Sequence, residues 1–286
     1  GVYVNVEDRV RQSYQPSVVA GEKPLEIWFF GGSTMFGFDA QRDLHTIPSE
    51  FARLAEQAGI PVRVRNYGSP GYVNFQETVL LGLLTSAGQR PDLAVFYDGV
   101  NDQSLQLLNA VGGINALGDP ADLGTSQQRN ALFGSGAVPG GSPEPPAAFT
   151  SDLQRPYSAD DVVQAVNSVY AQGMDVASAM GERHGFDAMW FWQPTLFTKQ
   201  PLHPGEQLLM SRLGLDQFRF DSMAAMSDQI TQNLPDNVVD ISDALDATSG
   251  PVIADNVHIN EEGARAVADA MFEAARPKLE RLMQAG

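Results

Sequence analysis

A serine, a histidine and an aspartate occur in this sequence where they could act together on an acyl group. Ser33 directly follows the apolar run LEIWFF and two glycines, whereas Asp255 and His258 stand three residues apart in ADNVHIN, before the last predicted helix. A carboxylate this close in sequence can accept a hydrogen bond from one imidazole nitrogen, which leaves the other free to take the proton of a serine hydroxyl. The three residues therefore predict a nucleophile, its general base and the group that orients the base.

The same chemistry needs hydrogen-bond donors where negative charge develops on the carbonyl oxygen. The backbone N–H groups of Ser33 and of Gly68 in NYGSPG, with the side-chain amide of Asn101 in GVND, could supply three. Each of these residues follows a predicted strand, and the carboxyl ends of parallel strands lie at one edge of a sheet. We therefore predict that Ser33, Gly68 and Asn101 form an oxyanion hole.

Each motif taken alone has an ordinary alternative. Gly-Gly-Ser-Thr after a strand is also a common turn into a helix, with Ser33 or Thr34 as the N-cap. Met35 stands where the nucleophile elbow of α/β-hydrolases would have a glycine. Asp255 and His258 could belong to a metal site, but no third and fourth ligand stand at a recognisable spacing, so we expect no metal.

The elements that must position these residues alternate between strand and helix about five times. We expect strands over 25–30, 61–67, 92–99, 186–194 and 237–241, and helices over 46–58, 72–89, 158–185, 207–233 and 260–284, with a possible edge strand over 3–6. This order predicts a three-layer α/β/α sandwich around a parallel sheet of about five strands. In the helix over 72–89, the apolar residues Val79 and Leu83 are expected to face inward. Trp190 and Trp192 are expected in the core.

The bulk composition limits the classes of function. A net charge of −17 argues against nucleic acid and anionic membrane surfaces as partners, and a chain without cysteine has no thiol nucleophile. We expect an N-terminal extension over 1–24 and one large domain over 25–286. The domain contains a Gly/Pro-rich insertion at about 109–156, which is either a lid or binding loop or an insertion without function.

The blocks around Ser33, Gly68, Asn101 and His258 together, in this order, resemble the SGNH hydrolases, also called the GDSL esterase/lipase superfamily. The resemblance spans Leu25 to about Lys278. It implies a flavodoxin-like sandwich, a catalytic triad and oxyanion hole made of the residues named above, and no metal or organic cofactor. The chain departs from the family at Gly32, where the usual residue is an aspartate. The leading segment also resembles the stretch that follows a membrane anchor in related bacterial proteins, which implies an extracytoplasmic location.

We expect a serine esterase that hydrolyses carboxylic esters, acetyl or carbohydrate-linked esters among them, through an acyl-enzyme. Two alternatives stay open, which are an O-acyltransferase that uses the same site and a non-catalytic module that binds polysaccharide or lipid. A small-molecule or carbohydrate ester is the expected partner. The predicted substrate contacts, chosen because they stand near the relevant turns, are Phe36, Tyr72, Phe197 and Lys199.

Overall fold

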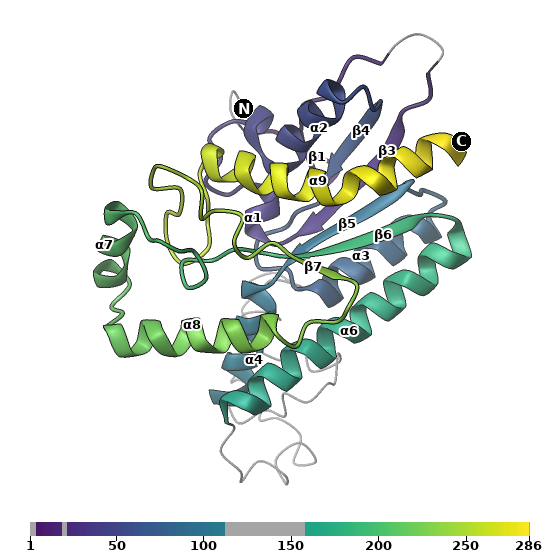
Figure 1. Cartoon of the computed structure of the whole chain (residues 1–286). Coiled ribbons are helices and arrows are strands. Elements are labelled where there is room, and N and C mark those ends of the chain that lie inside the picture. The colour runs from purple at the N-terminus through teal and green to yellow at the C-terminus, as the bar shows by residue number, and fades with distance from the viewer. Residues whose placement is uncertain (1–3, 19–21, 112–157, 286) are drawn as a thin grey trace, which may run out of the picture.

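The computed structural model describes residues 4–18, 22–111 and 158–285 (Figure 1). Within these residues the strands form one seven-stranded sheet with the order β1-β2-β4-β3-β5-β6-β7. Its five parallel strands are β4 (Val62–Asn66), β3 (Leu25–Gly31), β5 (Leu93–Asp98), β6 (Asp187–Trp192) and β7 (Val238–Asp240). The predicted parallel sheet of about five strands is therefore confirmed.

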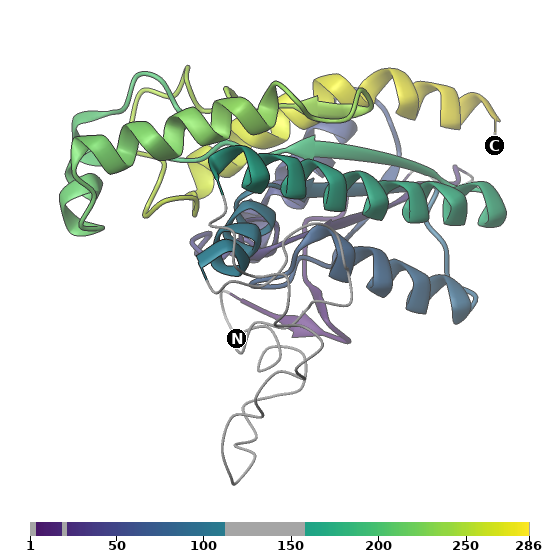
Figure 2. The same cartoon turned by 90° about the horizontal axis from the view of Figure 1, so that it is seen from below.

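Helices cover both faces of the sheet, as predicted for an α/β/α sandwich. On one face lie α2 (Ile47–Gln57) and α9 (Glu261–Ala285); on the other lie α3 (Asn74–Ser86), α4 (Val100–Val111) and α6 (Ala159–His184). Figure 2 shows the second layer from below, with α8 (Gln217–Thr231) beside α6. The short α7 (Pro204–Arg212) precedes α8. The stretch 207–233, predicted to be helical in one or two pieces, thus belongs to two helices.

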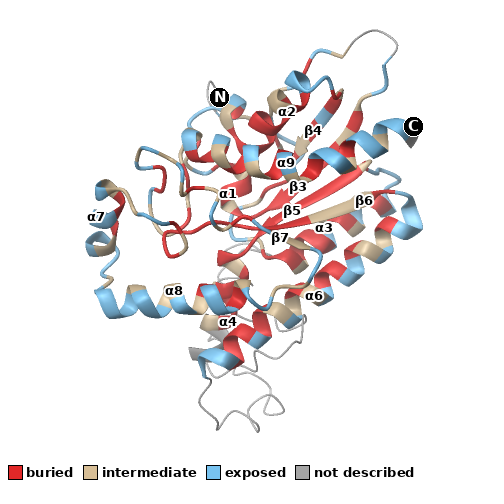
Figure 3. Ribbon diagram, in the orientation of Figure 1, coloured by how far each residue is buried: buried red, intermediate tan, exposed pale blue. Residues whose placement is uncertain are grey.

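The central strand β3 is buried on both faces (Figure 3). Ile27 and Phe29 belong to the core under α2 and α9, whereas Trp28 and Phe30 belong to the core under α6. This placement explains the continuous apolar run, because a strand covered on both faces needs no polar alternation. As predicted, Trp190 of β6 lies in the core, where its ring stacks on that of Phe96.

The N-terminal segment adds two antiparallel strands, β1 (Val6–Glu7) and β2 (Val10–Arg11), at the β4 edge of the sheet. The turn between them places Asp8 and Arg9 at φ of 50° and 67°, the left-handed geometry of a tight hairpin. The buried guanidinium of Arg11 donates hydrogen bonds to the Asp43 carboxylate and to the carbonyls of Gly37 and Ala40. The division of the chain at residue 24 stays a prediction, but this segment pairs with the sheet.

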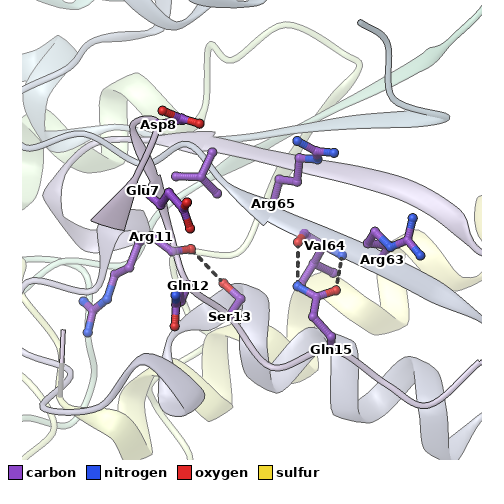
Figure 4. Close-up of a pocket in the computed structure, with 10 residues that line it drawn as sticks. Glu7, Asp8, Arg11, Gln12, Ser13, Gln15, Arg63, Val64 and Arg65 are labelled. Carbon is purple, nitrogen blue, oxygen red and sulfur yellow. Dashed lines mark hydrogen bonds between the residues drawn. The ribbon is translucent and has the colours of Figure 1, made fainter. Parts of the chain in front are cut away.

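Beyond β2 the chain continues along β4 without forming a further strand. Figure 4 shows the hollow at this edge, where the Gln15 side chain lies against Val64. Its amide donates to the Val64 carbonyl at 2.8 Å and accepts from the Val64 N–H at 3.2 Å. The side chain therefore satisfies backbone groups that an exposed sheet edge would otherwise offer to another strand.

Two features of the helices differ from the sequence prediction. The helix α4 was not predicted. The helix α3 presents a different face to the core, because Val79 and Leu83 are 47% and 60% exposed whereas Gln76 and Glu77 are buried. The insertion predicted at about 109–156 lies outside the described residues, apart from the end of α4. None of the helices described is long and apolar enough to cross a membrane.

Candidate active site

Three chain segments meet at the carboxyl ends of β3, β4 and β5. Ser33 begins the one-turn helix α1 (Ser33–Phe36) directly after β3, and Asn101 lies in the first turn of α4 directly after β5 (Figure 1). The loop before α9 brings in His258. An antiparallel bridge between Ile253 and Ile259 closes this loop, and the Ala254 N–H donates to the His258 carbonyl at 2.8 Å. The histidine is therefore carried on a short, hydrogen-bonded turn.

The structure places Ser33, His258 and Asp255 in a hydrogen-bonded row. Ser33 Oγ lies 2.6 Å from His258 Nε2, and His258 Nδ1 lies 2.6 Å from Asp255 Oδ2. The second carboxylate oxygen of Asp255 accepts the backbone N–H groups of Val257 and His258, both at 2.9 Å. These bonds fix the carboxylate relative to the imidazole. The row has the connectivity of a nucleophile, base and orienting acid.

The charges of the row stabilise one another. Burial alone would raise the pKa of Asp255, but the hydrogen bonds from the His258 side chain and from two backbone N–H groups lower this pKa to about 2. The hydrogen bond to Asp255 raises the pKa of His258 above 6.5, against the opposing effect of burial. Asp255 is therefore ionised at neutral pH, and its charge favours the protonated form of the His258 imidazole.

A third carboxylate lies near this row. Oxygen atoms of Asp39 and Asp255 and a nitrogen of His258 all lie within 4.8 Å of one another, which makes these residues the one group of this kind among the described residues. Both ring nitrogens of His258 already face a partner, Asp255 on one side and Ser33 on the other. A metal ion here would have to displace one of these hydrogen bonds.

The predicted oxyanion donors differ in how free they are. Ser33 stands at the first position of α1, and within the described residues its N–H has no acceptor. The amide of Asn101 donates one hydrogen to the Tyr72 carbonyl at 2.8 Å, and its Nδ2 lies so close to Gly32 that a Cβ there would stand 2.3 Å away. The N–H of Gly68, by contrast, donates to Asn66 Oδ1 at 2.9 Å. Two of the three predicted donors are therefore available as the chain stands, and the role of Gly68 stays a prediction.

Phe38, which follows the end of α1 at Gly37, was not predicted from the sequence to lie near the site. Gly37 ends α1 in the left-handed conformation, at φ 83°, and the Phe38 N–H donates to the Ser33 carbonyl at 3.0 Å. This pattern is a Schellman cap, which reverses the chain at a glycine. It places the Phe38 ring 5.0 Å from the His258 ring, while 61% of Phe38 stays exposed. The only indication in the sequence was Gly37, because a glycine directly after a helix is typical of such a cap.

Of the four predicted substrate contacts, two line a cavity whose wall includes Gly68 but none of Ser33, Asn101 and His258. Phe36 and Tyr72 line a cavity of about 550 Å³ together with Gly68, and Phe75 and Leu80 of α3 continue its wall. The cavity has the size of a small-molecule pocket.

The other two predicted contacts are engaged within the fold. Phe197 is 6% exposed and packs against Phe220. The prediction for Lys199 was wrong: its ammonium is buried and donates to Glu206 Oε2 at 2.7 Å, while the other oxygen of Glu206 accepts the N–H groups of Val252 and Ile253. The Lys199 ammonium thus neutralises the buried carboxylate of Glu206, and the buried side chain is not placed to contact a substrate.

Three buried carboxyl groups lie behind Asn101. Asp98 ends β5, Asp102 follows Asn101, and Glu77 comes from α3. Asn74 donates its side-chain amide to Asp98 at 3.1 Å and its backbone N–H to Asp102 at 3.3 Å. Burial raises the pKa of all three carboxyl groups, that of Asp98 to about 6. The cluster therefore holds protons near neutral pH and ties α4 to the start of α3.

No protein-family model and no curated protein matches the chain. Among solved structures, it is similar to the acetyl xylan esterase AlAXEase, at 15% identity and a TM-score of 0.47, over 87% of this chain and 99% of that one. It is similar to a lipase/acylhydrolase from Enterococcus faecalis, at 15% identity and a TM-score of 0.45, over 89% and 96% of the two chains. It is also similar to a member of the lipolytic protein G-D-S-L family from Veillonella parvula, at 16% identity and a TM-score of 0.42, over 87% of this chain and 96% of that one. Likenesses at these scores carry no conclusion about function.

Proposed function

We propose that this protein is a serine ester hydrolase of the SGNH type, which forms an acyl-enzyme on Ser33. The observation that carries the proposal is the continuous row from Ser33 Oγ through His258 to Asp255, with both hydrogen bonds at 2.6 Å. A binding module has no need of a nucleophile, a base and an orienting carboxylate in this connectivity. The row favours the catalytic alternative for that reason.

In the first half of the reaction, Ser33 Oγ attacks the carbonyl carbon of the ester while its proton passes to His258 Nε2. The carbonyl oxygen becomes an oxyanion, which we assign to the N–H of Ser33 and the free N–H of the Asn101 amide. The bond from the carbonyl carbon to the alcohol oxygen then breaks, and His258 returns the proton to the departing alcohol. Asp255 keeps its charge throughout and stabilises the imidazolium.

In the second half, His258 takes a proton from a water molecule, whose oxygen attacks the acyl carbon. The bond to Ser33 Oγ breaks, the serine recovers a proton from His258, and a carboxylic acid leaves. The cavity lined by Phe36, Gly68 and Tyr72 is the place that we assign to the acyl group. If a sugar hydroxyl takes the place of water, the same steps give acyl transfer.

The test is hydrolysis of aryl acetate, butyrate and octanoate by the wild type, Ser33→Ala and Ser222→Ala at pH 8. Ser222 is an exposed serine of α8 and serves as the matched control. We expect turnover in the wild type and the control, a loss of at least about 10³-fold in Ser33→Ala, and a mass increase of the wild type equal to one acyl group during turnover. Equal rates in all three proteins would contradict the proposal. A transferase would instead give a product that depends on an added carbohydrate acceptor.

A further inference from the structure

Phe38 is an aromatic side chain left in solvent at the mouth of the candidate site. It is 61% exposed although its ring lies 5.0 Å from the His258 ring, with an interplanar angle of 33°. Gly37 before it and Ala40 two residues after it are buried. A single exposed apolar side chain is common on protein surfaces, so the relevant observation is the position of this ring beside the His258 ring.

The backbone around Phe38 is fixed by the helix that carries the nucleophile. The Phe38 N–H is bonded to the Ser33 carbonyl, and the Gly37 N–H is bonded to the carbonyls of Ser33 and Thr34. Gly37 also has no room for a side chain, because a Cβ there would stand 2.7 Å from Thr46 Cγ2. The backbone of Phe38 is therefore held in a fixed position relative to that of Ser33.

The transfer of a proton from His258 to the departing alcohol determines which part of the ester lies near Phe38. His258 Nε2 must deliver its proton to the oxygen of the departing alcohol, so the alcohol lies beside the imidazole, while the carbonyl oxygen points to Ser33 N–H and Asn101. Phe38 lies beside that imidazole. Asp39 adds a carboxylate within 4.8 Å of a ring nitrogen of His258. The alcohol therefore meets an aromatic face and a hydrogen-bond acceptor.

We propose that the alcohol part of the ester is a sugar ring that stacks on Phe38 and donates hydroxyl hydrogen bonds to Asp39. This inference rests on the proposed ester hydrolysis and names the substrate class of that site. A sugar ring has a face of C–H groups that packs on the negative face of an aromatic ring, and hydroxyl groups around its rim. A simple alkyl alcohol has the apolar part but no hydroxyl for Asp39. A phenol has a flat apolar ring and equally lacks the rim of hydroxyl groups.

The test compares glucose pentaacetate, partly acetylated xylo-oligosaccharides, ethyl acetate and phenyl acetate as substrates of the wild type, Phe38→Ala, Phe38→Tyr and Asp39→Asn. We expect kcat/KM for both sugar esters to fall about tenfold in Phe38→Ala and to recover in Phe38→Tyr, while ethyl acetate falls much less. Asp39→Asn should lower kcat/KM for the partly acetylated sugar more than for glucose pentaacetate, which has no free hydroxyl, because the loss of the Asp39 charge near His258 affects all four substrates alike. Phe218→Ala, which removes an exposed phenylalanine of α8, is the matched control.

An equal loss on all four substrates in Phe38→Ala would overturn the inference, because Phe38 would then only position His258. A loss for phenyl acetate as large as that for the sugar esters would also overturn it in favour of an apolar leaving group. Binding of the oligosaccharide esters to Ser33→Ala, followed by saturation-transfer NMR, separates the two proposals. Binding that is lost when Phe38→Ala is added supports the stacking even if the wild type hydrolyses no ester, whereas binding that does not depend on Phe38 contradicts it.

Discussion

The buried carboxyl group of Asp98 predicts how the stability of this protein depends on pH. Its Oδ2 accepts hydrogen bonds from the Asn74 amide at 3.1 Å and the Tyr170 hydroxyl at 3.2 Å, and a hydrogen bond with the Glu77 carboxyl group also favours its ionised form. The other titratable groups that face it are Glu77 of α3 and Asp102 of α4, and neither supplies a positive charge. Ionisation of Asp98 is therefore poorly compensated.

The size of the effect follows from the pKa. Burial is the main cause that raises the pKa of Asp98 from 3.8 to about 6, against hydrogen bonds that lower it. Each pKa unit corresponds to about 1.4 kcal/mol, so the folded state loses about 3 kcal/mol as the pH rises. The sign is fixed because the folded state binds the proton more tightly. The contribution is fully present below pH 3.8, falls between about pH 4 and 6, and is lost above about 6.

The perturbation is Asp98→Asn, which keeps an acceptor for Asn74 and Tyr170 but cannot ionise. Urea unfolding followed by fluorescence of the buried tryptophans gives the free energy of unfolding at pH 4 and pH 7. We expect the variant to gain roughly 2 kcal/mol relative to the wild type between these two values, because at pH 4 the unfolded wild type is already partly ionised at this position. Asp175→Asn, at an exposed position of α6, is the control and should show no such difference. Parallel pH curves for Asp98→Asn and the wild type would refute the reasoning.

Further predictions concern the site and its frame. Lys199→Met should lower the free energy of unfolding in urea by about 3–5 kcal/mol, because it leaves the Glu206 carboxylate buried without its partner. Gly32→Ala should lower kcat about 10²-fold with little change in the urea midpoint, since the new Cβ would displace the Asn101 amide. Wild-type kcat/KM should rise with pH through an apparent pKa above 6.5, because Asp255 raises the pKa of His258; in Asp255→Asn this midpoint should fall, and the rate should drop roughly 10⁴-fold.

The sequence was most informative about the residues at the strand ends. Ser33 and Asn101 each follow an apolar run typical of a buried strand, Gly68 follows a strand that alternates Val with Arg, and a parallel sheet brings such positions to one edge. The resemblance to a known family added the order of the blocks. The spacing of Asp255 and His258 then left few ways to arrange the two side chains other than the observed one.

The sequence was least informative where polar groups are buried. Hydrophobic periodicity predicted that Val79 and Leu83 of α3 face the core. The helix instead buries Glu77 near Asp98 and Asp102. A prediction from periodicity assumes that polar residues face water. It therefore cannot detect a buried cluster of carboxyl groups contributed by α3, β5 and α4. The same limit explains Lys199, whose partner Glu206 lies only seven residues away but carries no signature of burial in the sequence.

The short helix α1 shows how the site gains rigidity that no local pattern supplies. A helix of four residues is not stable alone, and α1 is fixed from both sides by the loops after β4 and β5. On one side Asn66 donates to the Met35 carbonyl and accepts the Gly68 N–H, and a Cβ on Gly68 would stand 2.3 Å from the Phe36 nitrogen. On the other side the Asn101 amide lies so close to Gly32 that a Cβ there would stand 2.3 Å from Asn101 Nδ2. The glycine at position 68 is therefore required by the close packing of α1 whether or not its N–H ever meets an oxyanion. Since α1 also carries Phe38 through its cap, the same contacts set the position of Ser33 and of the surface proposed to bind the alcohol.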